Sequence, residues 1–159
     1  MAKVKYGRVE GDATGREYPV AASQYFHRLG GKFVYLSAGN VTLCASNSTE
    51  VAGWANTPKA AAGYNAWKSS ATAEADSVFV HYGIDDVYEM PYDNATNASL
   101  AASLIGLGCT PVLSGSTYTI TQKARYHATT ASNLLDIVDV DTDNTTVCVK
   151  IRPTKKQNI

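Results

Sequence analysis

The sequence predicts a mainly β fold: a small β-barrel or sandwich of short antiparallel strands, with one short α-helix and an extended N-terminal arm. Polar and apolar residues alternate with a period of two through most of the chain, and clusters of Gly, Asn, Asp and Ser separate the runs. The 159 residues, 45% of them hydrophobic, can bury one core without disulfides or metals. We therefore predict a single β-rich domain over 18–152, an arm over 1–17 and a polar tail over 153–159.

The predicted arm differs in composition from the rest of the chain. Three of its first eight residues are basic, Gly7 and Gly11 interrupt it, and no alternating pattern is sustained before residue 18. These features are typical of an arm or of a frayed first strand.

Runs of β-forming residues separated by turn clusters predict the strands of the domain. The predicted strands are 32–36, 41–44, 77–82, 87–90, 117–124, 135–140 and 146–151. The first two and the last two of these runs are each separated by a short turn and predict hairpins. In the final run, Val147, Val149 and Ile151 point to one face, and the polar residues between them point to the other.

One stretch has helical spacing. Thr96 or Asn97 can cap a short α-helix, and Gly106 and Gly108 end it before Pro111. Its apolar stripe would comprise Leu100, Leu104, Ile105 and Leu107. Such a helix would cover the face or the open end of a sheet.

The cysteines and the net charge restrict the cellular compartment and the kinds of partner that we expect. Cys44, Cys109 and Cys148 are odd in number and lack CxxC spacing, so we expect small buried hydrophobes in a protein made in a reducing cytoplasm. Fourteen basic residues balance fourteen acidic ones, which argues against a nucleic-acid partner. No apolar run reaches the ~20 residues that cross a bilayer, and no apolar segment typical of an export signal follows the start, so no membrane partner is expected.

Catalysis finds little support. His27, His81 and His127 are scattered, and no nucleophile elbow is present. We therefore expect packed histidines, no enzymatic activity and no cofactor. A pocket that gathers a histidine with Asp85 or Asp86 would indicate an enzyme instead.

One acidic motif imitates a calcium loop. Asp139, Asp141 and Asp143 alternate as calcium ligands do, but Asn144 stands where the loop needs Gly and Lys150 where it needs Glu. We expect no metal there, and a turn built by residues 141–144 instead.

The charges are unevenly distributed along the chain. No Lys or Arg lies between Lys68 and Lys123, whereas both ends of the chain are relatively basic. The acidic residues of this interval are Glu74, Asp76, Asp85, Asp86, Glu89 and Asp93. Two interpretations remain open: an ordinary solvated surface, or a dipolar subunit that meets its copies or a partner through complementary faces.

The aromatic residues favour contact surfaces. Ten Tyr and two Trp stand against three Phe, and a tyrosine hydroxyl needs a polar exit. Tyr64 and Trp67 occur in a loop of small residues, either as contact residues or as a lid packed on the domain. The candidate interface residues are Lys3, Lys5, Tyr6, Arg8, Tyr64 and Trp67.

Two parts of the chain resemble the head decoration (cement) proteins of tailed bacteriophages. The first is QYFHRLGGKFVYL at 24–36 with AGNV at 38–41, and the second is IVDVD at 137–141 with VCVKIRP at 147–153. The resemblance covers the overall pattern from about residue 17 onward, without a diagnostic motif.

This resemblance implies a structural virion protein that is made in the host cytoplasm and lies on the outer capsid surface. Its partners would be the major capsid protein of an icosahedral phage head and further copies of itself, commonly as a homotrimer. Its role would be to bridge capsid subunits against internal DNA pressure, with the N-terminal arm lying across the shell or a neighbouring subunit.

Two other functions stay open. Trp54, Tyr64 and Trp67 could stack on sugar rings in a carbohydrate-binding β module or another receptor- or host-surface-binding domain; exposed aromatic side chains with nearby carboxylates would support this. An enzyme whose catalytic residues meet only in three dimensions is the other.

Overall fold

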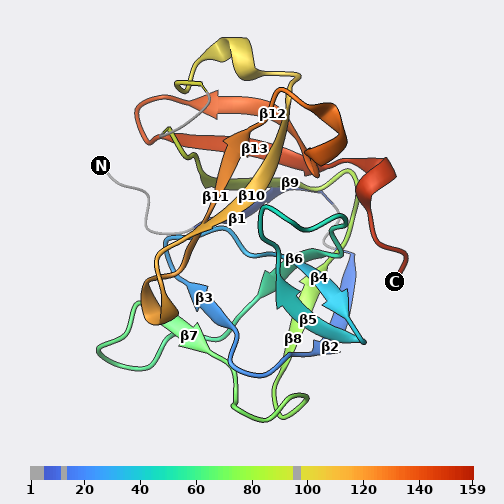
Figure 1. Cartoon of the computed structure of the whole chain (residues 1–159), viewed down its shortest axis with the longest axis vertical. Helices are drawn as coiled ribbons and strands as arrows, with labels where there is room; N and C mark the ends of the chain where they lie inside the picture. The colour runs from blue at the N-terminus through green and yellow to red at the C-terminus, as the bar shows by residue number, and fades with distance from the viewer. Residues whose placement is uncertain (1–5, 12–13, 95–97) are drawn as a thin grey trace.

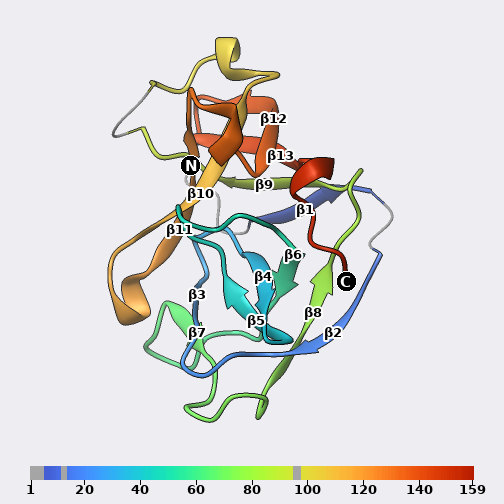
Figure 2. The same ribbon diagram turned by 45° about the vertical axis from the view of Figure 1, so that its right-hand side comes forward.

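A computed structural model describes residues 6–11, 14–94 and 98–159. Strands make up 46% of the structure and helical residues 7%, and the strands form three antiparallel sheets, which confirms the mainly β prediction. In Figures 1 and 2 the largest sheet lies above the other two.

The order of strands in each sheet defines the topology. The six-stranded sheet runs β1 (Gly7–Glu10), β9 (Val87–Pro91), β13 (Thr146–Ile151), β12 (Leu135–Asp141), β10 (Gly108–Ser114) and β11 (Thr121–Tyr126). The five-stranded sheet runs β2 (Gly15–Pro19), β8 (Ser77–His81), β6 (Gly53–Asn56), β4 (Phe33–Ser37) and β5 (Asn40–Leu43). The remaining elements are the pair β3 (Tyr25–His27) and β7 (Ala66–Lys68) and the 3-10 turns η1 (Ala102–Leu104), η2 (Thr117–Thr119), η3 (Thr130–Ser132) and η4 (Pro153–Lys155).

Both predicted hairpins are present. β4 pairs with β5 from Val34 opposite Leu43 to Ser37 opposite Asn40. β12 pairs with β13, and a bulge near Val138 shifts their register. The alternate residues of β13 that were predicted to face inward are buried, so the period-two pattern identified the inner face of this strand.

The strands β8 and β9 are both present, but they belong to different sheets. β8 pairs with β2 and β6, whereas β9 pairs with β1 and β13. The connecting segment 82–86 therefore carries the chain from the lower sheet to the upper one (Figure 1).

The six-stranded sheet curls without closing into a barrel. Its last strand, β11, approaches the end of β9 through one isolated bridge, between Tyr92 and Ala124. Beyond this bridge the two strands do not form a ladder, so the barrel alternative of the predicted fold is not realised as a closed barrel.

Three aromatic side chains join the two large sheets. Phe33 of β4 meets Trp54 of β6 and Tyr88 of β9 edge to face, with ring centroids 5.0 and 5.2 Å apart, and Trp54 stacks on Tyr88 at 5.4 Å. All three residues are buried, and they belong to the same hydrophobic cluster as the inner residues of β12 and β13. A second cluster, around Phe26 and Val34, fills the lower part of the molecule.

A buried glutamine also joins the sheets. The Gln122 side chain on β11 accepts a hydrogen bond from the Phe33 N–H at 2.8 Å and donates to the Phe33 and Cys44 carbonyl oxygens, each at 2.9 Å. It therefore satisfies backbone groups that would otherwise be buried without partners.

The predicted α-helix is absent from the described residues. Only the turn η1 forms, and its flanking residues Ala101 and Ile105 have extended backbone angles. Gly106 donates to the Ile137 carbonyl at 2.8 Å, so the chain is already aligned on β12 where the helix would have continued. Pairing with the sheet replaces a helix too short to be stable alone. Thr96 and Asn97, the predicted caps, lie outside the described residues.

The N-terminal segment is built into the sheets where the structure describes it. β1 pairs with β9 and β2 pairs with β8, so residues 7–10 and 15–17 do not form an arm separate from the domain. Gly11 has φ +114°, and a Cβ there would overlap Asp86, so this glycine permits close packing of the segment. Residues 1–5, 12 and 13 lie outside the described residues.

The predicted polar tail is likewise bound to the domain. Val51 donates to the Lys155 carbonyl at 2.9 Å, and Gln157 donates to the Val51 carbonyl at 2.8 Å. The Gln157 side chain also pairs with both backbone groups of Leu36, at 2.7 and 2.9 Å. The C-terminal segment thus behaves as a short added strand. No helix among the described residues has the length and apolar character to span a membrane.

Candidate functional site

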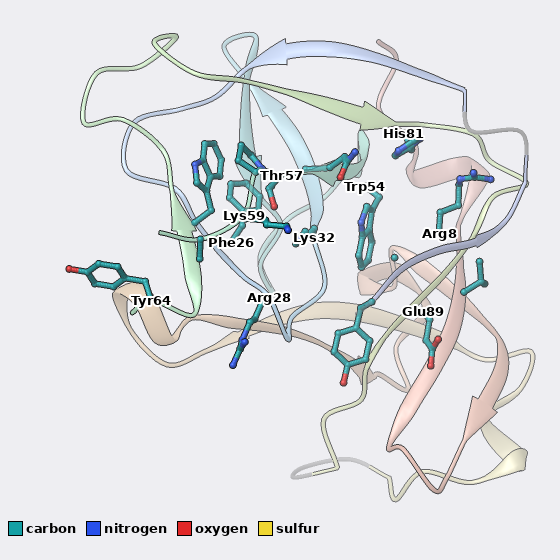
Figure 3. A pocket seen from close by; sticks show the side chains of 18 residues that line it. Arg8, Phe26, Arg28, Lys32, Trp54, Thr57, Lys59, Tyr64, His81 and Glu89 are labelled. Carbon is teal, nitrogen blue, oxygen red and sulfur yellow. The ribbon is translucent and has the colours of Figure 1, made fainter. Parts of the chain in front are cut away.

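An open cleft of about 880 Å³ lies where the three sheets meet. β1 forms one wall, and the segment from Trp54 to Ala60 forms another (Figure 3). The lining residues are Tyr6, Gly7, Arg8, Val9, Phe26, Arg28, Lys32, Trp54, Ala55, Asn56, Thr57, Pro58, Lys59, Ala60, Tyr64, Trp67, His81 and Glu89. We call this site the basic cleft, because four of its residues are cationic and one is acidic.

The basic cleft gathers four of the six interface residues predicted from the sequence. Tyr6 and Arg8 come from the N-terminal segment, and Tyr64 and Trp67 come from the loop of small residues and from β7. Lys3 and Lys5, the other two, lie outside the described residues. Pairing of β1 with β9 brings the N-terminal pair to the cleft.

The two aromatic residues of the small-residue segment differ in their environment. Trp67 is partly buried and packs on Phe26, with ring centroids 5.8 Å apart, as the lid interpretation expects. Tyr64 is 52% exposed and stacks on Tyr118 at 4.3 Å, and Tyr118 in turn meets Tyr25 edge to face. Tyr64 therefore fits the contact interpretation.

The cations of the cleft come from distant parts of the sequence. Arg8, Arg28 and Lys59 are exposed, and Lys32 is partly buried. Figure 3 shows Arg8 and His81 at one end, Tyr64 at the other, and Lys32 and Lys59 between them. Of these four cations, only Arg8 is an interface residue predicted from the sequence, because nothing in the chain order brings the other three together.

The acidic lining residue is already engaged. Glu89 is 4% exposed, and its Oε1 accepts a hydrogen bond from the Thr146 hydroxyl at 2.8 Å. The exposed charge at the mouth of the cleft is therefore positive, and clefts lined by one sign of charge concentrate ligands of the opposite sign.

Two polar atoms in the cleft wall have no hydrogen-bond partner among the described residues. These are the Thr57 Oγ1 and the His81 Nδ1, both buried from solvent. Burying a polar atom without a partner costs free energy. Side chains away from the cleft, such as Tyr18 and Thr110, also hold such atoms, so these two do not by themselves mark a ligand site.

Trp54 is not available as a stacking platform. It is 4% exposed, and its ring contacts both Phe33 and Tyr88. Of the other two aromatic residues proposed for sugar binding, Tyr64 is exposed and Trp67 is partly buried.

The acidic interval of the sequence does not form an acidic face. Asp86 and Glu89 are buried, Asp93 forms an ion pair with Arg125, and Asp76 accepts the Ser70 N–H at 2.6 Å. The exposed acidic residues of this interval are Glu74 and Asp85. This interval therefore does not supply the negative face that the dipolar-subunit interpretation expects from it, whereas the cleft gathers four cationic residues.

The arrangement that would have indicated an enzyme is not formed by the lining residues. His81 lines the cleft, but Asp85 and Asp86 do not. Among the residues that the structure describes, no group of three or more His, Cys, Asp or Glu could hold a metal ion. The calcium-like motif builds a turn, since the Asp141 carboxylate accepts the backbone N–H groups of Asp143 and Asn144 at 3.0 and 3.1 Å.

Burial determines the protonation of three further groups. It raises the pKa of the Cys44 and Cys109 thiols well above their usual range, so both stay protonated, as expected of buried hydrophobes. Burial, aided by the charge of Arg28, lowers the pKa of His27, whose Nδ1 accepts the Leu29 N–H at 3.1 Å. The neutral form of this imidazole, beside the cleft cation Arg28, is therefore favoured.

No family model, curated protein or solved structure matches this chain. The resemblance to head decoration proteins therefore rests on the sequence segments at 24–41 and 137–153 alone.

Proposed function

We propose that this protein is a structural virion protein that binds the outside of an icosahedral phage head and stabilises the shell by bridging capsid subunits, as a homotrimer. The observation that carries the proposal is the composition of the basic cleft. Tyrosine, tryptophan and arginine dominate the energetics of protein interfaces, and Tyr6, Arg8, Arg28, Tyr64 and Trp67 lie around this one concave surface.

The role requires binding alone. A protein that binds only the assembled shell stabilises that state by mass action, without any chemical step. A specific interface buries roughly 1,200–2,000 Å², more than the cleft alone offers, so the surrounding strands and the partner subunits of the trimer would supply the rest.

Sedimentation with phage heads tests this proposal. The purified protein is mixed with heads of the phage that carries its gene, before and after the heads expand, and the pellet is quantified. The proposal expects saturable binding to expanded heads and a native mass of about 51 kDa, three times the 17.0 kDa chain. Failure to pellet with either form of the head at micromolar concentration would contradict it.

A carbohydrate-binding function is the second candidate, because Trp54, Tyr64 and Trp67 all line the same cleft. The burial of Trp54 and the engagement of Glu89 argue against a neutral sugar site. Binding to host-surface glycans, in the absence of binding to heads, would favour this candidate.

A further inference from the structure

We propose that the basic cleft binds an extended acidic peptide segment of the partner protein, aligned along the edge of β1. This inference rests on the proposed function, because it takes the cleft face to be the surface that meets the capsid. It specifies the chemistry of the partner, which the head-binding role leaves open.

The charge of the cleft selects an anionic ligand. Arg8, Arg28, Lys32 and Lys59 surround the opening, and Glu89 is buried against Thr146. Arg8 donates to the Gly11 carbonyl, which fixes this guanidinium at the β1 end of the cleft. A ligand with carboxylates spaced along its length would meet these four cations, and Glu89 is the one lining residue of like charge among those that the structure describes.

The strand edge selects a peptide over other polyanions. Among the described strands, β1 pairs with β9 alone, so it forms an edge of the six-stranded sheet. Residues 6–9 on this edge line the cleft, and both views show β1 at the border that faces the lower sheets (Figures 1 and 2). An extended peptide can pair with the free backbone groups of an edge strand, whereas a saccharide or a nucleic acid cannot form such a ladder.

Two features of β1 restrict which peptide sequences can pair with its edge. β1 has four residues, and its register with β9 shifts between Arg8 and Glu10, which leaves Val9 as a bulge. Bulges and charged side chains protect an edge strand from unselective pairing. A peptide segment with acidic side chains neutralises the charge of Arg8, so it can pair with the edge of β1.

The aromatic side chains add recognition beyond charge. Tyr64 lies on the side of the cleft opposite Arg8 (Figure 3), and Trp67 also lines the cleft. Apolar parts of a peptide ligand would pack on these rings.

Fluorescence anisotropy with labelled octapeptides tests the inference. The probes are an alternating Thr-Glu peptide, a Thr-Lys peptide of equal length, and a Pro-Glu peptide that keeps the acid groups but lacks alternate backbone N–H donors. We expect the Thr-Glu peptide to bind roughly tenfold more tightly than either control, and more weakly as sodium chloride rises from about 50 to about 500 mM. Equal affinity for all three peptides would overturn the inference.

A charge-reversal variant locates the binding. The double variant Arg28→Glu and Lys59→Glu changes two exposed cleft residues, and Arg16→Glu with Lys150→Glu makes the same change in charge away from the cleft. We expect the first pair to weaken Thr-Glu binding roughly tenfold and the second to leave it unchanged, with circular dichroism confirming that both fold. Equal effects of the two pairs would contradict binding in the cleft. Direct binding of a labelled acidic oligosaccharide or of labelled single-stranded DNA, with no binding of the Thr-Glu peptide, would overturn the inference and assign the cleft to that ligand instead.

The same variants in the head sedimentation assay separate this inference from the proposed function. If the wild-type protein and the Arg28→Glu and Lys59→Glu variant pellet equally with expanded heads, the head-binding role stands and the acidic-segment inference fails. If the wild-type protein binds Thr-Glu peptide but does not bind heads, the head-binding role fails.

Discussion

Gly11 follows β1 and lies against the buried carboxyl group of Asp86. Its φ of +114° is strained for any residue with a side chain, and a Cβ would overlap Asp86. We predict that Gly11→Ala lowers the free energy of unfolding by about 1–3 kcal/mol in urea titration. Gly39→Ala is the matched control, because its φ is +83° but its Cβ would meet open space. Equal losses in the two variants would mean that backbone strain, and not crowding against Asp86, explains the effect.

Gln122 stabilises the fold by hydrogen bonding to buried backbone groups. Its side chain satisfies one N–H and two carbonyl groups of Phe33 and Cys44. We predict that Gln122→Leu lowers the free energy of unfolding by at least about 3 kcal/mol, because each buried group left unpaired costs about 1–3 kcal/mol. Gln157→Leu is the control, since water can reach the backbone of the partly exposed Leu36 that it pairs with. A loss for Gln122→Leu no larger than that of the control would contradict this role.

His27 makes stability depend on pH. Because its pKa is below the ordinary value of 6.5, the folded protein binds fewer protons than the unfolded chain at mildly acidic pH. The contribution of neutral His27 to the free energy of unfolding is therefore fully present above pH 6.5, and it is lost as the pH falls below that value. We predict that the free energy of unfolding decreases from about pH 7.5 to about pH 5.5, and that His27→Gln makes this decrease shallower. A decrease of the same slope in the variant would assign the effect to other groups.

At the scale of elements, β1 connects the fold to the proposed binding surface. It covers the edge of β9, all of whose residues are buried, and Tyr6 packs on the first hydrophobic cluster. We predict that deletion of residues 1–10 lowers the melting temperature by roughly 4–8 °C, as a loss of about 2 kcal/mol would in a domain of this size. It should also abolish binding to heads.

The matched control is a shorter deletion that ends before Tyr6 and leaves β1 in place. An unchanged melting temperature after removal of residues 1–10 would restore the interpretation of this segment as an arm that adds nothing to the domain.

The elements that the sequence predicts correctly are those whose pattern is local. The β12–β13 hairpin follows from alternation along each strand and from the turn that Asp141 closes. The prediction of a short helix around Leu100 and Leu104 is wrong, although the apolar spacing fits, because Gly106 and Leu107 form backbone hydrogen bonds with Ile137. That competition depends on a strand about 30 residues away and leaves no mark in the helical spacing.

The N-terminal segment shows a second kind of error. The arm prediction takes Gly7 and Gly11 as signs of irregular chain. Gly11 instead provides the space for close packing on Asp86, whereas a Cβ at Gly7 would meet no atom within 4 Å. A glycine alone does not distinguish flexibility from tight contact, because both need the missing Cβ.

At the scale of the whole molecule, the candidate site is assembled from residues that lie far apart in the sequence. Arg8, Arg28, Lys32 and Lys59 are spread over some 50 residues of the chain, and the meeting of three sheets brings them to one cleft. Their grouping follows from the topology, which the alternation pattern does not determine. Four of the interface residues predicted from the sequence nevertheless line this cleft: Tyr6, Arg8, Tyr64 and Trp67.

The net charge of zero does not reveal that the exposed charge is unevenly distributed over the surface. The acidic residues between 74 and 93 are mostly buried or paired, whereas the cations of the cleft are mostly exposed. The protein thus combines a balanced composition with a locally positive surface, and such local fields guide association with charged partners.

Amide hydrogen exchange on head-bound protein tests the central claim, that the basic cleft is the surface that meets the partner. Exchange is compared between the free protein and protein bound to expanded heads. We predict slower exchange on binding in residues 6–9, 26–32 and 54–67, which line or flank the cleft, and unchanged exchange in the β12–β13 hairpin. Slower exchange confined to that hairpin, with the cleft segments unchanged, would contradict the account.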